Sequence, residues 1–151
     1  EEDQLFAIQK IYLKDVSFES PNSPQAFTDG DWKPEINVQI NSSNRAVAED
    51  VYEVILDVTV TSKFEDKTAF LAEVKQAGLF TIGGFPKEQL GGMVGAYCPE
   101  TLFPYAREAV SDLVTKGGFP PLLLAPVNFN ALYTQHMQQQ AAAQAEEETA
   151  H

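Results

Sequence analysis

Few side chains in this sequence have the types and spacing that acid–base, nucleophilic or metal chemistry requires. Neither of the two histidines, His136 and His151, has a cysteine or carboxylate at metal-ligand spacing. The one cysteine, Cys98, lacks a histidine partner for nucleophilic catalysis and precedes Pro99, so we interpret it as a small packed residue. The nucleophile elbow, the P-loop and the dinucleotide fingerprint are also missing from the sequence. We therefore expect no catalytic site, no cofactor and no metal.

Carboxylates are abundant, and Glu53 and Asp57 fall on one face of a predicted strand. We interpret this pair as part of a solvated sheet face rather than as a general acid and base. The glycines that follow the predicted strands are interpreted as turn residues; they are Gly83, Gly84, Gly91, Gly92 and Gly95. Without a credible catalytic set, the sequence favours a binding function.

Length and charge restrict the class of protein and its partners. The 151 residues fit one domain that can bury a core. A net charge of -12 disfavours nucleic acid and anionic membranes, and favours basic proteins and peptides, although solubility alone is an alternative reading. One cysteine excludes an internal disulfide, and no apolar run is long enough to cross a bilayer or resembles a signal peptide. We expect a cytoplasmic protein.

Alternating apolar residues predict a sheet in the first half of the chain. The predicted strands cover residues 5–18, 36–40, 51–61 and 68–80. Lys14 and Asp15 mark a bulge or bend in the first strand. Short connections imply antiparallel pairing, with room for one longer crossover through the turn-rich residues 20–31.

The fourth predicted strand has two faces of different character. One face carries Leu71, Glu73 and Lys75, and the other carries Phe70, Ala72, Val74 and Gln76. Because the first face mixes charges with a leucine, it is either an ordinary solvent face or a binding surface.

Helices are predicted in the second half of the chain. After a short helical turn near residues 87–90, a helix begins near Pro99 or Pro104 and ends at Lys116 and Gly117. Its apolar stripe consists of Leu102, Phe103, Ala106, Ala109, Val110, Leu113 and Val114. Asn128 is a suitable N-cap for a last helix.

Beyond Gln140 the composition predicts a frayed helix and then an acidic disordered tail. Residues 1–140 are therefore expected to form the domain, and residues 141–151 the tail.

Several apolar residues lie outside the predicted strands. They are Trp32, the leucines at 122–124 and the helical stripe Phe129, Leu132 and Tyr133. These residues either close the core or line a groove. A groove would hold an extended apolar segment through many small contacts, because burial yields about 25 cal/mol per Å² without selecting a sequence.

The sequence resembles the SecB family of bacterial export chaperones across its folded part. The resemblance is carried, in the family's order, by KDVSFESPN at 14–22, DWKPE at 31–35, DVYEV at 50–54, TAFLAEVKQAGLF at 68–80, GAYCPETLFPYARE at 95–108 and PVNFNAL at 126–132. It implies an α+β fold, in which a long helix and a C-terminal helix pack on one side of a four-stranded antiparallel sheet.

The resemblance also implies a function and partners. SecB-type chaperones bind unfolded secretory precursors in hydrophobic grooves without ATP, assemble as homotetramers that are dimers of dimers, and deliver their clients to the motor ATPase SecA. The basic, zinc-binding carboxyl-terminal segment of SecA is implied to dock on Asp15, Glu19, Leu71 and Glu73. The zinc belongs to that partner.

Further residues are matched to the client groove and to assembly. The implied client-binding residues are Trp32, Ile36, Val38, Ile40, Leu122, Leu123, Phe129, Leu132 and Tyr133. The implied assembly residues are Ala72, Val74, Gln76 and Tyr105.

Two other functions are kept as alternatives. A SecB-like chaperone dedicated to one partner, such as an antitoxin, would hold only one of several unrelated unfolded clients. A small-molecule-binding or enzymatic α+β domain would have an enclosed pocket with convergent polar groups, whereas a chaperone would have long open grooves.

Overall fold

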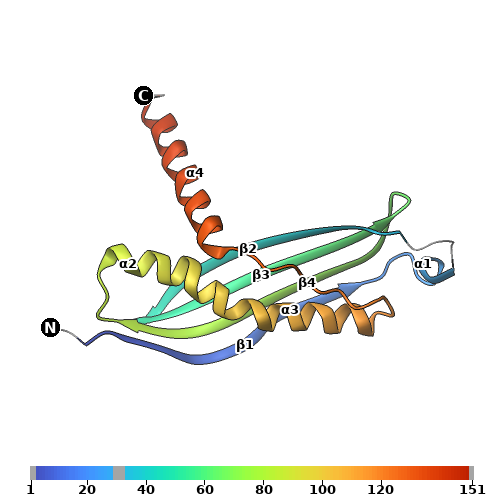
Figure 1. Cartoon of the computed structure of the whole chain (residues 1–151), viewed down its shortest axis with the longest axis horizontal. Coiled ribbons are helices and arrows are strands. Elements are labelled where there is room, and N and C mark those ends of the chain that lie inside the picture. Colours follow the sequence, from blue (N-terminus) through green and yellow to red (C-terminus); the bar gives the residue numbers. More distant parts are fainter. Residues whose placement is uncertain (1–2, 29–32, 150–151) are drawn as a thin grey trace.

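The computed structural model describes residues 3–28 and 33–149 and contains one four-stranded sheet (Figure 1). The strands are β1 (Leu5–Glu19), β2 (Glu35–Ala48), β3 (Val51–Phe64) and β4 (Lys67–Gly83). They pair in the order β1-β4-β3-β2, and every pairing is antiparallel, which confirms the predicted sheet. The predicted crossover joins β1 to β2 at opposite edges and carries the short helix α1 (Gln25–Thr28). Trp32 lies outside the described residues.

Two bulges interrupt β1. Its register against β4 shifts between Ile8 and Lys10 and again between Leu13 and Asp15. The second shift confirms the predicted irregularity at Lys14 and Asp15. A strand alternates its side chains between two faces, so each extra residue moves all later residues to the opposite face.

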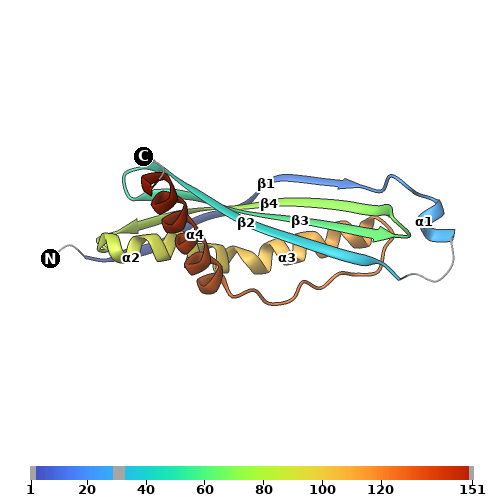
Figure 2. The ribbon, with the colours of Figure 1, turned by 90° about the horizontal axis from the view of Figure 1, so that it is seen from above.

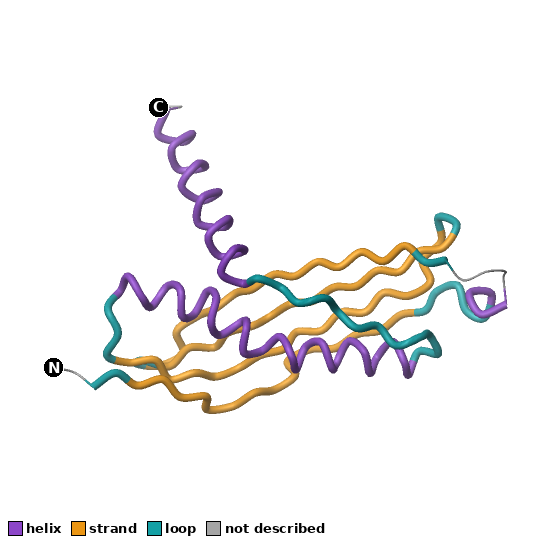
Figure 3. The backbone as a smooth tube through the Cα atoms, viewed as in Figure 1, coloured by secondary structure: helices purple, strands orange, loops and turns teal. Residues whose placement is uncertain are grey.

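The helical segment of residues 87–116 forms a layer on one face of the sheet (Figure 2). Helix α2 (Lys87–Gly92), the π-helical turn η1 (Met93–Tyr97) and helix α3 (Cys98–Lys116) follow one another without a break. The junction residues Gly92 and Cys98 both have right-handed helical angles, so residues 87–116 are continuously helical. A long connection then runs back along α3 to helix α4 (Phe129–Thr149), which projects from the body (Figure 3).

One prediction about the helices was wrong, because Gly91, Gly92 and Gly95 are helical rather than turn residues. Of the two predicted starts of the long helix, Pro99 occupies the first turn of α3, whereas Pro104 lies inside α3 and is exposed. Helix α4 continues to Thr149, and its residues 134–149 are all exposed. The disorder of the tail stays a prediction.

The core lies between α3 and the covered face of the sheet. Val58, Val74 and Leu102 are fully buried there. Gly78 of β4 leaves room for two core side chains, because a Cβ atom at this position would lie 2.6 Å from the ring of Phe80 and 3.0 Å from Cδ2 of Leu102. The predicted apolar stripe of α3 therefore packs where expected and leaves the opposite sheet face uncovered.

Candidate binding surfaces

The uncovered face of the sheet brings together the four residues implied to bind SecA. Glu19 of β1 pairs with Leu71 of β4, and Glu73 pairs with Ser17 two residues farther along. Asp15 pairs with Lys75 at the next outward position. Without the bulge at Lys14, Asp15 and Glu19 would point toward the helices, so the bulge is what creates this acidic patch.

A second acidic group on this face is neutralised locally. Asp57 of β3 lies 3.7 Å from the ammonium group of Lys75. The two side chains are partly exposed, so solvent weakens their attraction. Asp57 offsets the charge of Lys75. The carboxylates of Asp15, Glu19 and Glu73 therefore give this end of the open face its net negative charge.

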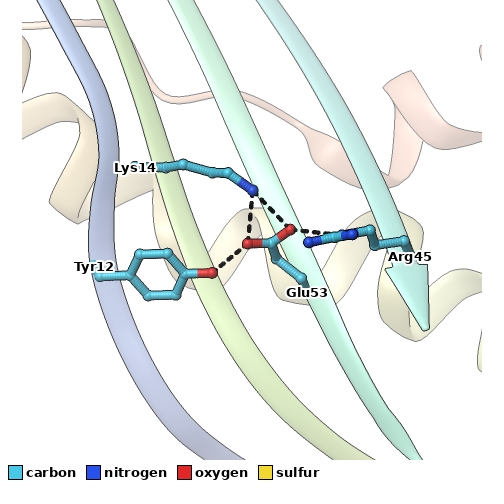
Figure 4. A network of polar contacts seen from close by, with 4 residues as sticks. All are labelled: Tyr12, Lys14, Arg45 and Glu53. Atoms are coloured by element: carbon cyan, nitrogen blue, oxygen red, sulfur yellow. Dashed lines mark hydrogen bonds and ion pairs between the residues drawn. The ribbon is translucent and has the colours of Figure 1, made fainter. Parts of the chain in front are cut away.

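A buried carboxylate joins three strands near the other end of the open face (Figure 4). Glu53 of β3 accepts hydrogen bonds from the hydroxyl of Tyr12, from Nζ of Lys14 at 2.9 and 3.0 Å, and from Nε of Arg45 at 3.0 Å. Glu53 and Asp57 share one face, as predicted, but Glu53 is only 5% exposed and is not a solvated residue. Tyr12 and Lys14 connect β1 to β3 across the intervening β4, and Arg45 connects the neighbouring strand β2 to β3.

These contacts fix the protonation states of the cluster. Hydrogen bonds from Tyr12 and Lys14 lower the pKa of Glu53 to about 2, even though its burial acts in the opposite direction. Burial, together with the hydrogen bond to Glu53, raises the pKa of Tyr12 to about 12. Glu53 therefore stays ionised and Tyr12 stays neutral near pH 7, which suits a structural clamp rather than a proton-transfer pair.

Replacing the carboxylate is expected to change the pH dependence of stability. The pKa of Glu53 falls from an ordinary 4.5 to about 2 on folding, so the stabilisation is present above pH 4.5 and is lost as pH falls toward 2. Glu53→Gln should lower the free energy of unfolding at pH 7 and flatten its fall in acid. Urea unfolding between pH 7 and pH 2.5 measures both changes. Asp57→Asn is the matched control, and equal acid slopes for Glu53→Gln and the parent protein would contradict the assignment.

Cys98 is fully buried at the start of α3, which confirms its interpretation as a packed residue. Burial raises the pKa of its thiol to about 12, so the reactive thiolate is suppressed.

The second surface is a cleft of about 580 Å³ between the edge strand β2, the helical residues around η1 and the first turns of α4. It brings together Ile40, Phe129, Leu132 and Tyr133 from the predicted client-binding set. The other members lie elsewhere. Ile36 lines a separate hollow farther along β2, and Val38 is exposed between the two.

The leucine loop is divided between the core and solvent. Leu124 is buried and Leu122 packs partly against the core, whereas Leu123 is 81% exposed. Neither Leu122 nor Leu123 lines the cleft. Leu123 thus adds an isolated apolar contact rather than a wall of the groove.

Sequence reasoning missed part of the cleft lining. The missed residues are Asn41, Ser42, Asn44, Gly91, Val94, Gly95, Gln135, His136, Met137, Gln139 and Gln140. Many of them are polar, so the cleft offers amide groups to a peptide backbone as well as apolar contacts. The Gly91 and Gly95 spacing of four residues could have indicated close helix packing, but these glycines were interpreted as turns.

Helix α4 is attached to the cleft at its amino-terminal end. Asn128 caps it by accepting a hydrogen bond from the backbone N–H of Ala131 at 3.0 Å, as predicted. The ring of Phe129 packs edge-on against Phe103 with centroids 5.6 Å apart, and Phe129 is 5% exposed. This aromatic contact anchors α4 to α3.

The residues matched to assembly occupy two different environments. Ala72 and Val74 are fully buried beneath the helices, and Gln76 is buried with its Nε2 donating to the carbonyl oxygen of Tyr12 at 3.1 Å. These three can act on assembly only through packing inside the subunit. Tyr105 is half-exposed on α3 and is free to touch another subunit. Their role in assembly stays a prediction.

Residues 3–28 and 33–149 contain neither a helix suited to spanning a membrane nor a cluster of metal-binding side chains. No helix in these ranges is long and apolar enough to cross a membrane. The same ranges contain no cluster of three or more histidine, cysteine, aspartate or glutamate side chains that could hold a metal ion.

Comparisons with known proteins agree with one another. A family model described as preprotein translocase subunit SecB matches residues 1–140. The protein-export protein SecB of Nitrosococcus oceani is 61% identical over 143 residues, which cover 94% of this chain and 87% of that protein. The corresponding protein of Methylococcus capsulatus is 56% identical over 149 residues, covering 99% and 95%.

A solved structure shares the fold. It is a SecB-like chaperone of Mycobacterium tuberculosis in complex with a ChAD peptide from the HigA1 antitoxin. The TM-score is 0.67 at 19% sequence identity, and the match covers 81% of this chain and 90% of that one.

Proposed function

The chain belongs to the SecB family of protein-export chaperones, and from this premise we propose that its two surfaces serve different partners. The cleft beside α4 holds extended segments of unfolded precursors without ATP. The acidic patch on the open sheet face receives the basic carboxyl-terminal segment of SecA. The protein works in the cytoplasm as a homotetramer, a dimer of dimers.

The observation that carries this proposal is the composition of the cleft. Ile40, Leu132 and Tyr133 provide apolar contacts, while asparagine and glutamine side chains line the same cleft. An unfolded segment presents both apolar side chains and unpaired backbone groups, so both kinds of lining are used. Such contacts hold many sequences weakly and reversibly, as a chaperone without an energy source requires.

The acidic patch supports the second part of the proposal. Asp15, Glu19 and Glu73 attract a cationic segment, and Leu71 provides an apolar contact beside them. In SecB-type chaperones the docked segment of SecA carries its own zinc, so this chain needs no metal ligands.

Native mass spectrometry tests the proposal directly. Spectra are recorded of the protein alone, with a reduced unfolded precursor, and with the carboxyl-terminal segment of SecA. We expect a tetramer that binds both. A monomer that binds neither would overturn the assembly, the cleft and the docking patch together.

A panel of unrelated unfolded clients tests the breadth of binding. A general export chaperone should delay folding or aggregation of most of them. Protection of a single client would instead favour a chaperone dedicated to one partner.

A further inference from the structure

Tyr133 of α4 packs against helical backbone that carries no side chains. A Cβ atom on Gly95 would lie 2.6 Å from Cδ2 and Cε2 of Tyr133, and one on Gly91 would lie 2.6 Å from its hydroxyl oxygen. Cβ atoms in proteins essentially never approach other heavy atoms below 3.0 Å. The tyrosine ring therefore fills the space that side chains would occupy at these positions. We call Gly91 and Gly95 the glycine socket.

The socket lies at an irregular point of the long helix. Gly95 belongs to η1, where the N–H of Cys98 bonds to the carbonyl oxygen of Met93, five residues earlier. Glycine inside a helix costs about 1 kcal/mol relative to alanine, and π-helical turns are rare and often lie at functional sites. Contact with Tyr133 gives a physical reason for glycine at 91 and 95.

Among the described side chains of α4, two pack against the core. Phe129 is buried against Phe103, and Tyr133 lies one turn later on the same face, in the socket. Every described residue of α4 beyond Tyr133, from Thr134 to Thr149, is exposed. Phe129 thus holds the start of α4, and Tyr133 sets the angle at which it leaves the body.

The angle of α4 determines the shape of the cleft. The first turns of α4 form one wall, and β2 forms the opposite wall with Ile40 and Asn44. We propose that the glycine socket positions α4 and thereby determines how bulky a client segment the cleft accepts. This inference rests on the client-binding function proposed above. Gly91 and Gly95 act as positioning residues through Tyr133.

The test compares two alanine substitutions in the same helical segment. Gly95→Ala places a methyl group against the Tyr133 ring, whereas a Cβ atom on Gly92 would meet nothing within 4 Å. Both changes raise helix propensity similarly, so Gly92→Ala is a matched control. In the full-length protein, Gly95→Ala should increase amide exchange of residues 132–137 by about tenfold, and Gly92→Ala should not.

A second readout reports on selectivity. Binding is measured for two unfolded model peptides of equal length and charge, one rich in phenylalanine and one rich in alanine. Gly95→Ala should change the ratio of their dissociation constants by about fivefold, a difference of about 1 kcal/mol. Gly92→Ala should leave the ratio unchanged.

A double variant tests whether the effect of Gly95→Ala arises from steric overlap with Tyr133. Tyr133→Ala should itself accelerate exchange in α4, and adding Gly95→Ala to it should cause little further change. Additive effects, or equal behaviour of Gly95→Ala and Gly92→Ala, would overturn the inference. If the parent protein held no client at all, the proposed function would fail, while the exchange data would still test whether the socket positions α4.

Discussion

Glu73→Lys is expected to weaken binding of the basic SecA segment by about tenfold or more at low salt, which corresponds to at least about 1.4 kcal/mol. Glu73 lies on the open face of β4 opposite Ser17, with Asp15 and Glu19 at neighbouring outward positions. The substitution replaces an attraction with a repulsion at the centre of the acidic patch. Titration of a fluorescent SecA segment at two salt concentrations measures the effect, and the loss should shrink as salt increases.

The fold should tolerate this change. Glu73 is partly exposed and lies outside the core, so the free energy of unfolding should change by no more than about 0.5 kcal/mol. Glu88→Lys is a suitable control, because it changes net charge equally on α2, which lies on the opposite side of the sheet. Equal SecA affinity for both variants would remove the acidic patch as the docking site. Client binding and subunit assembly should persist in both.

Ile40→Asp is expected to weaken binding of unfolded clients on the order of tenfold. Ile40 lines the cleft from β2, opposite Leu132 and Tyr133 on the other wall. Removing one apolar side chain from a contact loses about 1.5–3 kcal/mol, and an unpaired carboxylate beside the client adds a desolvation penalty. Inhibition of client aggregation and direct titration with an unfolded precursor both measure this loss.

The adjacent residue provides the control. Gln39 pairs with Thr59 on the open sheet face, whereas Ile40 pairs with fully buried Val58 on the helix face. Gln39→Asp therefore adds the same charge to the same edge strand without entering the cleft. Client binding that falls equally in both variants would show that charge on β2, and not loss of an apolar contact in the cleft, causes the effect. Thermal unfolding of both variants checks that β2 remains folded.

Strand periodicity explains why the sheet was predictable. Ile36, Val38 and Ile40 alternate with polar residues, and the structure places them on the helix side of β2. The two alternating sets of side chains on β4 likewise lie on opposite faces, with Ala72 and Val74 buried and Glu73 on the open face. A period of two fixes the face of each residue without knowledge of its partner.

Long-range contacts explain what the sequence could not reveal. Tyr12 and Glu53 are separated by 41 positions, so no local pattern indicates that they share a hydrogen bond. Gly91 and Gly95 resemble turn residues locally, but their helix is stabilised by its neighbours and packs against Tyr133. Tertiary packing overrides local propensity at both places.

The client cleft was predicted only in part for a related reason. Ile36 and Ile40 have the same apolar character and the same face in sequence, yet they line different hollows. The difference depends on where α4 crosses the edge of β2, which the sequence does not encode in any local pattern. Helix α4 shows this clearly, because among its described side chains only Phe129 and Tyr133 pack against the core.

The bulge at Lys14 determines which face of β1 each later side chain occupies. Leu13 pairs with Gln76 and Asp15 with Lys75, so Lys14 is the extra residue between two consecutive pairs. If Lys14 paired with Lys75 instead, every later residue of β1 would change face. Phe18 would then turn toward water, and Asp15 and Glu19 toward the apolar core. Substituting Lys14 would remove its contact with Glu53 but would leave the spacing of the strand unchanged, so the acidic patch depends on the bulge and not on the side chain at position 14.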